Sequence, residues 1–303
     1  MNILVTGALQ NPKVCMDKIQ KLGHSVCFLQ YENERLPCSY DDIDAVIGNG
    51  LFLSHPIQNF KNLKYIQLTS VGYDRVPLDY IKRNNIKINN ARGVYSIPMA
   101  EFVLSGVLQI YKKNREFYDN QRNHIWEKKR ELLELFGKKV CIVGCGSVGQ
   151  ECAKRFKAFG CNIIGIDNIL KVSENFDEVF RIDYLHECLH IADIIVLSIP
   201  LVVETKHLIN EKNISYIKQG SVLVNVSRGE IVQTNALLEA LKNKLLGAVL
   251  DVFEEEPLDP QNPLWDQHNV FITPHNSFIG ENNEERLHKI IIDNLRSYKW
   301  EKM

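Results

Sequence analysis

The sequence lacks the features that mark several classes of protein. It has no apolar stretch long enough to span a membrane, and no internal repeat or low-complexity tract. Its 36 Lys and Arg residues nearly balance its 37 Asp and Glu residues, so no charge excess would draw it to nucleic acid or to an anionic membrane. The chain opens on an apolar run without the basic start of a signal peptide. We therefore expect a soluble, cytoplasmic protein with neither nucleic acid nor a membrane as a partner.

Cysteine motifs are also missing. The eight cysteines include no CxxC pair, and none follows Cys188. Most of them lie inside apolar runs, as small core side chains do. Their spacing argues against a disulfide framework and against a zinc site, and it fits a reducing compartment. We expect no bound metal.

Short apolar runs recur along the chain, which is long enough at 303 residues for two domains. Helix-like spacing fills several of the gaps between the early runs, and this alternation predicts a parallel sheet with helices on both faces. The early runs are 3–5, 26–29, 45–47, 65–68 and 86–88. The later runs are 140–143, 163–166, 194–199, 222–226, 248–250 and 270–272. Polar residues follow most of the later runs. In a parallel sheet of this kind, ligands bind beyond the carboxyl ends of the strands, so we expect these polar residues to converge on one crevice there.

A glycine-rich turn follows the run 140–143. Gly144, Gly146 and Gly149 come directly after it, and Asp167 ends the next run about 20 residues further on, as in dinucleotide-binding folds. The first glycine permits a tight turn, the second lets a pyrophosphate approach the backbone, and the third lets helix and strand pack closely. A carboxylate at residue 167 would bind both ribose hydroxyls and repel a 2′-phosphate. The pattern therefore predicts NAD rather than NADP as the cofactor.

An arginine, a histidine and three acids follow later runs. Arg228 offers a permanent charge and a planar fork of donors suited to a carboxylate. The acids 254–256 precede His275, and if one reaches it, the contact fixes the imidazole tautomer and favours the protonated ring that carbonyl reduction needs. Spacing does not choose among the acids, and the simpler alternatives are a surface ion pair and a structural histidine. Together with a nicotinamide, this set predicts hydride transfer between a 2-keto acid and a 2-hydroxy acid.

At these residues the chain resembles the D-isomer-specific 2-hydroxyacid dehydrogenases, and the resemblance covers nearly the whole chain. No single segment is specific, but the combination is. The segments are Ser70 to Asp74, Gly144 to Gly149, Ile199 to Leu201 with Thr205 and Leu208 to Asn210, Val224 to Gly229, Asp251 to Phe253 with Glu256 to Leu258, and Thr273 to His275.

The resemblance implies a role for individual residues. It implies that Arg228 binds the substrate carboxylate and keto oxygen, that Glu256 is the partner of the histidine, and that His275 is the general acid/base. It also implies that the backbone N–H groups of Val71 and Gly72 bind the substrate carboxylate. The implied cofactor-binding residues, the last of them at the nicotinamide end, are Gly144, Gly146, Ser147, Val148, Gly149, Pro200, Thr205, Asp167 and Asp251.

The fold that the resemblance implies is two doubly wound α/β domains with parallel sheets and an interdomain cleft. A flavodoxin-like substrate-binding domain would comprise residues 1–98 and 280–303, completed by a helix around 285–298. A Rossmann NAD-binding domain would comprise residues 99–279. Family members are usually dimers formed through the cofactor domain, so we expect a homodimer. The apolar segment 99–111 is a candidate dimer surface, and a core helix is an equal alternative.

The resemblance leaves a second function open. The family includes transcriptional corepressors, so the alternative is an NAD(H)-sensing binding protein of the same fold.

Three positions depart from the family: Ser147 replaces a frequent Arg, Ser198 a frequent His, and Val202 a frequent Thr. These departures remove polar groups near the phosphates, and we expect weaker NAD binding but not its loss.

Loops of the first domain offer candidates for the pocket around the substrate side chain. They are Asn49, Leu51, Phe52, Ser70, Tyr73, Arg75 and Tyr95. Phe52 and Tyr95 hint at an apolar substrate group, whereas Arg75 or Lys64 hints at a phosphate; packing or surface roles are the simpler alternatives. The charged stretch 127–134 is interpreted as the exposed face of a helix.

Overall fold

The computed structural model describes residues 1–170 and 173–298. These residues form two units, each with its own parallel sheet. Unit 1 comprises Met1–Tyr95 together with the described residues from Gly280 onward, and unit 2 comprises Ser96–Ile279. The predicted fold class, two α/β domains with parallel sheets, is confirmed. The expected boundary at residues 98 and 99 falls inside the first helix of unit 2.

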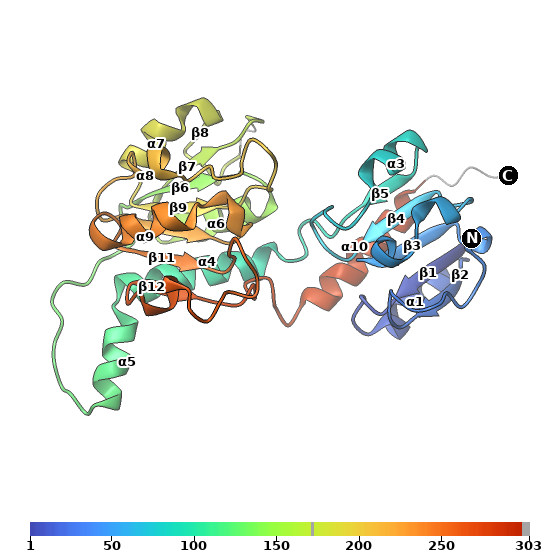
Figure 1. The fold of residues 1–303 in the computed structure, drawn as a ribbon, viewed down its shortest axis with the longest axis horizontal. Helices are drawn as coiled ribbons and strands as arrows, with labels where there is room; N and C mark the ends of the chain where they lie inside the picture. Colours follow the sequence, from blue (N-terminus) through green and yellow to red (C-terminus); the bar gives the residue numbers. More distant parts are fainter. Residues whose placement is uncertain (171–172, 299–303) are drawn as a thin grey trace. The chain divides into compact units, whose positions relative to one another are not determined.

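Unit 1 contains a five-stranded sheet in the order β2-β1-β3-β4-β5 (Figure 1). The strand order reverses beside β1, as in flavodoxin-like folds, so ligands would bind near the carboxyl ends of β1 and β3. The strands are β1 (Asn2–Thr6), β2 (Ser25–Leu29), β3 (Ala45–Gly48), β4 (Tyr65–Leu68) and β5 (Lys87–Asn89). The helices are α1 (Pro12–Lys21), η1 (Tyr40–Asp42), α2 (Leu51–Ser54), η2 (Ile57–Asn59), α3 (Leu78–Arg83) and α10 (Asn283–Ser297).

The last helix, α10, belongs to unit 1 because its apolar face completes the core of that unit. Leu287, Ile291 and Leu295 are buried with residues of β1 and β3 in one hydrophobic cluster. The guanidinium of Arg286 donates to the carbonyl of Val94 at 2.8 Å. Two segments that lie far apart in the sequence therefore form one folded unit, an arrangement that the family resemblance implies.

Unit 2 contains a seven-stranded sheet in the order β12-β11-β10-β9-β6-β7-β8 (Figure 1). The order reverses beside β6, the strand that leads into the glycine-rich turn, and this is the arrangement of a Rossmann fold. The strands are β6 (Lys139–Val143), β7 (Asn162–Ile166), β8 (Glu178–Phe180), β9 (Ile194–Leu197), β10 (Val222–Asn225), β11 (Gly247–Leu250) and β12 (Val270–Ile272). The helices are α4 (Ser96–Tyr111), α5 (Asn114–Arg122), α6 (Ser147–Ala158), η3 (Ile182–Tyr184), α7 (Leu185–Ile191), α8 (Glu211–Ile214), η4 (Gly229–Ile231), α9 (Thr234–Asn243) and η5 (Pro263–Asp266).

The apolar helix α4 packs against the sheet of unit 2. Its buried face includes Ala100, Val103 and Val107, which share a hydrophobic cluster with residues of β6 and β10. A methyl group on Gly106 would lie 2.6 Å from a Val249 methyl, so this face approaches β11 closely. One face of the helix is therefore core. Among the described residues, no helix combines the length and the apolarity required to cross a bilayer.

Two parts of unit 2 differ from the sequence interpretation. The edge strand β8 was not predicted, because only two of its three residues are apolar. The charged stretch 127–134, predicted as a helix face, contains no helix. Its backbone pairs instead with the end of α4: the N–H of Leu133 donates to the carbonyl of Tyr111, and the Lys112 ammonium donates to the carbonyl of Leu133. Because the N–H and the carbonyl of Leu133 are bound to α4 and to Lys112, they do not form the hydrogen bonds that a helix in this segment would need.

Candidate active site

The glycine-rich turn connects β6 to α6. Gly144 has φ +100°, a conformation that side-chain-bearing residues rarely adopt, and a methyl group on Gly149 would lie 2.0 Å from the Gly144 carbonyl oxygen. Gly146 is the N-cap of α6, and neither a capping side chain nor an acid in the first turn neutralises the positive end of this helix. These features fit a dinucleotide pyrophosphate, which would bind the N–H groups at this end.

Asp167 lies against this turn, at the end of β7. One carboxylate oxygen accepts from the N–H of Cys145 at 2.9 Å, and the other accepts from the N–H of Ile169 at 2.9 Å. The side chain is therefore fixed beside the glycines by two backbone donors. This is where a ribose-binding carboxylate is expected in a fold of this kind.

The segment after β9 also approaches the turn. The Ser198 hydroxyl donates to the Gly144 carbonyl at 2.9 Å, so this departure from the family pattern ties two strand ends together. The Thr205 hydroxyl donates to the Pro200 carbonyl at 2.8 Å and accepts from the N–H of Val202. Pro200 and Thr205 thus form one closed loop at the carboxyl edge of the sheet.

The three predicted catalytic residues follow three neighbouring strands. Arg228 follows β10, Glu256 follows β11 and His275 follows β12, and these strands are adjacent in the sheet. The guanidinium of Arg228 is half-buried and donates to the Ser227 carbonyl at 2.8 Å. A methyl group on the next residue, Gly229, would overlap the backbone of Phe253, so the loops after β10 and β11 are in direct contact.

Glu256 pairs with His275. Nδ1 of the imidazole lies 2.8 Å from a Glu256 carboxylate oxygen, and the other oxygen accepts from the N–H of Phe253 at 3.0 Å. The His275 side chain is 42% exposed, so a substrate can reach it. Since a carboxylate accepts, Nδ1 carries the proton, and Nε2 is the atom left for chemistry. The structure thus selects one acid from the three that spacing left open.

Asp251 lies beneath the loop that carries the histidine. It is 1% exposed, and its carboxylate accepts from the Thr273 hydroxyl at 2.7 Å and from the N–H groups of Asn276 and Ser277. His275 itself has φ +51°, a strained conformation for a residue with a side chain, and its N–H donates to the Asp251 carbonyl at 2.8 Å. These contacts hold the strained loop in place.

A second histidine and acid pair was missed by the sequence interpretation. Nε2 of His207 lies 2.7 Å from Glu254, whose other oxygen accepts from the N–H of Thr234 at 2.8 Å and from its hydroxyl. The N–H of His207 donates to the Glu230 carbonyl at 2.7 Å. Glu254 therefore ties the loop after β11 to the start of α9 and to the segment before α8. A single histidine in a turn gave no pattern from which this contact could be predicted.

Removing Glu254 should destabilise the protein at neutral pH. Burial raises the pKa of this carboxyl, but hydrogen bonds from Thr234 and His207 outweigh it and hold the pKa below the ordinary value of 4.5. Glu254→Ala should lower the free energy of unfolding by about 1 kcal/mol at pH 7, a modest value because the site is partly exposed. Because the pKa of Glu254 is lower in the folded state than in the unfolded state, its ionised carboxylate stabilises the folded protein above pH 4.5. This contribution is lost as the pH falls through the pKa of the folded state.

Urea titrations at pH 7 and below pH 4 check this prediction. The difference between Glu254→Ala and the wild type should shrink at the lower pH. The control is Glu255→Ala, which removes the neighbouring, exposed acid. Equal effects of the two substitutions at pH 7 would contradict the role assigned to Glu254.

In unit 1, Val71 and Gly72 lie in the loop after β4. The Asn90 amide donates to the Val71 carbonyl at 2.6 Å, and the Ser70 hydroxyl donates to the Gly72 carbonyl at 3.2 Å. The N–H of Ala91 donates to the Ser70 carbonyl at 2.9 Å. Together these bonds fix the peptide groups that carry the N–H of Val71 and the N–H of Gly72. Val71 is 43% exposed, so the loop is accessible to a ligand within its own unit.

Two of the candidate side chains for the substrate pocket have packing roles. The ring of Phe52 meets that of Phe60 at 5.6 Å between centroids and packs on the core of unit 1. The Tyr95 hydroxyl donates to the Thr69 carbonyl at 2.5 Å, and burial raises the pKa of this phenol. Neither therefore supports an apolar substrate group.

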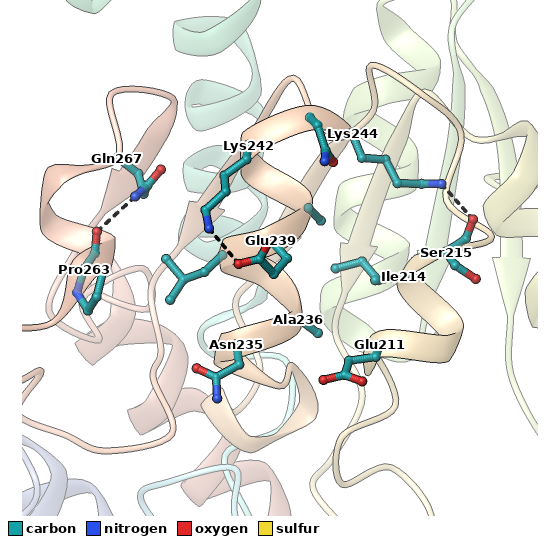
Figure 2. Close-up of a pocket in the computed structure, with 13 residues that line it drawn as sticks. Glu211, Ile214, Ser215, Asn235, Ala236, Glu239, Lys242, Lys244, Pro263 and Gln267 are labelled. Carbon is teal, nitrogen blue, oxygen red and sulfur yellow. Dashed lines mark hydrogen bonds and ion pairs between the residues drawn. The ribbon is translucent and has the colours of Figure 1, made fainter.

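A surface hollow of about 570 Å³ lies among α8, α9 and η5 (Figure 2). Figure 2 shows Lys242 directed at Glu239 and Lys244 at Ser215, contacts of 2.6 and 2.7 Å. Its described lining includes none of the predicted site residues. Because its cations are already paired with groups of the protein, we do not assign it to the cofactor.

Comparison with known families decides the assignment. Residues 104–277 match the family model described as D-isomer specific 2-hydroxyacid dehydrogenase, NAD binding domain. The chain belongs to this family. Membership supports an oxidoreductase with a nicotinamide dinucleotide cofactor and a small keto or hydroxy acid substrate.

Relatives in the 2-hydroxyacid dehydrogenase family cover nearly the whole chain. The D-3-phosphoglycerate dehydrogenase of Methanocaldococcus jannaschii is 32% identical over 98% of this chain, which spans only 57% of that relative. The structure of D-lactate dehydrogenase from Aquifex aeolicus, complexed with NAD and lactic acid, is 26% identical with a TM-score of 0.78, covering 98% of this chain and 95% of that one. A family member from Xanthobacter autotrophicus, in complex with NADPH, is 25% identical with a TM-score of 0.80, covering 97% and 93%.

Proposed function

We propose that this protein is an NAD-dependent oxidoreductase that interconverts 2-keto acids and D-2-hydroxy acids. The observation that carries the proposal is the His275–Glu256 pair at 2.8 Å, on the strand edge that also carries Arg228 and the glycine-rich turn. A proton donor and a carboxylate-binding cation beside a dinucleotide site are what reduction of a keto acid requires. Family membership supports the same reaction class.

His275 would transfer the proton. In reduction, Nε2 of the protonated imidazole donates its proton to the carbonyl oxygen of the substrate, and in oxidation Nε2 removes the proton from the hydroxyl. Glu256 holds Nδ1 throughout, so the ring keeps its orientation and its positive charge is balanced. The proton-transfer atom is thereby fixed on the side of the ring opposite Glu256.

Arg228 would hold the substrate and polarise its carbonyl. Its fork of N–H donors suits a carboxylate oxygen and a keto oxygen together, and the charge is retained at any working pH. We further propose that the N–H groups of Val71 and Gly72 bind the substrate carboxylate. The bonds to the carbonyls of Ser70 and Val71 fix the two peptide groups that carry these N–H groups, and this supports the assignment.

The cofactor proposal rests on the turn and on Asp167. The pyrophosphate would lie on the N–H groups of Gly146, Ser147 and Val148 at the start of α6, with the loop of Pro200 and Thr205 beside it. When bound, the nicotinamide supplies the hydride that reduces the keto carbon. We propose that Asp251 lies at the nicotinamide end of the bound cofactor. Its carboxylate accepts hydrogen bonds from Thr273 and Asn276 in the loop that carries His275, and this supports a place near the reacting ring.

NADH should be preferred over NADPH by about 100-fold in kcat/KM, because a 2′-phosphate would face the carboxylate of Asp167. Asp167→Ser should lower this ratio by at least about tenfold. Steady-state kinetics with both cofactors measure it. The control is Asp183→Ser, which removes an exposed acid of the same unit and should leave the ratio unchanged. A wild-type protein that prefers NADPH would contradict the cofactor assignment.

A panel of keto acids tests the reaction. Purified protein should oxidise NADH only when a 2-keto acid is present, and the panel is pyruvate, glyoxylate, hydroxypyruvate, 2-ketoisocaproate and 3-phosphohydroxypyruvate. Turnover with at least one of them supports the proposal. Tight NADH binding without turnover of any of them would overturn it in favour of a nucleotide-sensing binding protein.

We propose a homodimer formed through unit 2. Figure 1 shows α5 and the segment that follows extending away from the sheet of this unit. This arm, residues 114–132, exposes large aromatic side chains: Trp126 is 95% exposed and Tyr118 is 60% exposed. Apolar groups gathered on a projecting segment are typical of a surface that a partner covers.

Trp126→Ser should weaken the dimer by about tenfold or more, because buried tryptophans dominate many interfaces. Sedimentation over a range of concentrations measures the dissociation constant. Tyr184→Ser, which removes an exposed aromatic ring outside the arm, is the control. A monomer at all concentrations would contradict the proposed dimer.

A further inference from the structure

Two cysteines of unit 1 lie in contact. Sγ of Cys27, on β2, is 3.2 Å from Sγ of Cys38, in the loop between β2 and η1. Both are free thiols, and both are half-buried at the margin of one hydrophobic cluster. A disulfide bond is about 2 Å long, so a movement of about 1 Å would join them.

The other six cysteines differ from this pair. Five of them are buried: Cys15, Cys141, Cys152, Cys161 and Cys188. The sixth, Cys145, is half-buried in the glycine-rich turn. The sequence interpretation, which took the cysteines as small core side chains, therefore fits most of them but does not explain Cys27 and Cys38.

The segment between the two thiols holds a loop at the carboxyl edge of the sheet. It contains Glu32, whose carboxylate accepts from the N–H groups of Asn49 and Gly50 at 2.7 and 2.6 Å, and from the Thr6 hydroxyl at 2.7 Å. These donors lie at the ends of β1 and β3, where the strand order of unit 1 reverses. Whatever restrains the segment 27–38 therefore also restrains the loop after β3.

We propose that Cys27 and Cys38 form a reversible intramolecular disulfide that clamps this loop. The oxidant is a low-molecular-weight disulfide such as oxidised glutathione. The two thiols lose two electrons and two protons and form one S–S bond, while the S–S bond of the oxidant breaks and yields two thiols. The site is a covalent modification site on unit 1 and does not depend on the proposed function.

The exchange takes two steps. One of the two thiols attacks the oxidant as its thiolate, forms a mixed disulfide and releases the first thiol of the oxidant. The other cysteine then attacks this mixed disulfide and releases the second thiol. The distance of 3.2 Å between the two sulfurs makes this second step intramolecular.

Trypsin gives a direct test, because it cleaves after Arg35, between the two cysteines. The full chain is equilibrated with oxidised glutathione, the free thiols are blocked by alkylation, and the digest is analysed by mass spectrometry. The peptides 22–35 and 36–61 should be joined by a disulfide and should separate on reduction. If both peptides carry only the blocking group or only glutathione at equilibrium, the proposal is overturned.

Single variants test the mixed-disulfide step. At least one of Cys27→Ala and Cys38→Ala should accumulate one glutathione on its remaining cysteine, because the partner that would resolve the mixed disulfide is missing. If neither variant carries glutathione, the proposed route to the disulfide is wrong. Both substitutions are conservative in size, and circular dichroism confirms that each variant is folded before it is scored.

Hydrogen exchange tests the clamp without any assay of activity. Oxidation of the wild type should slow exchange at the amides of Asn49 and Gly50 by about tenfold, because their acceptor is then held by a closed loop. The amide of Cys145 in unit 2, bound to Asp167, is the internal control and should be unchanged. Unchanged exchange at Asn49 and Gly50 in the linked protein would overturn the clamp.

Discussion

Replacing His275 with glutamine should reduce kcat for keto-acid reduction by about 1,000-fold, within the range that a general acid contributes. Glutamine keeps hydrogen-bonding groups near Glu256 but cannot transfer a proton at neutral pH. The glycine-rich turn and Asp167 lie on other loops, so NADH should bind as tightly as it does to the wild type. Stopped-flow turnover and NADH fluorescence titration measure the two quantities separately.

The control for this substitution is His268→Gln, which changes an exposed histidine just before β12. It should retain wild-type kcat. If His275→Gln keeps more than about a tenth of kcat, His275 is not the general acid. If it loses NADH binding as well, the loss of turnover reflects the fold of the loop rather than proton transfer.

Replacing Arg228 with leucine should reduce kcat/KM by about 1,000-fold, within the range for removing one partner of a hydrogen-bonded charge pair. We expect KM to rise and kcat to fall together, because one guanidinium both holds the carboxylate and polarises the carbonyl. Arg228→Lys should recover part of KM, since a point charge remains, but less of kcat, since the planar fork is lost. Initial-rate kinetics over keto-acid concentration separate the two constants.

Arg181→Leu, which removes an exposed arginine of the same unit, is the matched control and should change neither constant. A rise in KM with an unchanged kcat would show that Arg228 only binds substrate. No change in either constant would remove Arg228 from the site.

Most of the fold could be predicted from the apolar runs. Within the described residues, eleven of the twelve strands overlap the predicted runs, which are mostly apolar because both faces of such a sheet are covered. The strand β8 lies at the edge of its sheet and needs less apolar surface, so its sequence gave too weak a pattern. The segment 127–134 was wrongly predicted as helical because charge patterning does not reveal that its backbone pairs with the end of α4.

The candidate site could be predicted as a set of strand ends, but its pairings could not. All three acids, 254–256, follow β11, so the sequence does not show which of them contacts His275. The path of the loop decides this: it directs Glu256 to His275 and Glu254 to His207. The family resemblance implies that Asp251 serves the nicotinamide end, but its contacts under the histidine loop, which span more than twenty residues, could not be predicted. Such contacts are set by tertiary structure and leave no local pattern.

In the proposed reaction, hydride passes to the keto carbon on the face that yields the D-hydroxy acid. The measurement uses NADH carrying deuterium at both C4 positions and the best keto acid of the panel other than glyoxylate, whose product has no D or L form. The product should be a D-hydroxy acid with one deuterium at C2. An L-hydroxy acid, or a product without deuterium at C2, would contradict it.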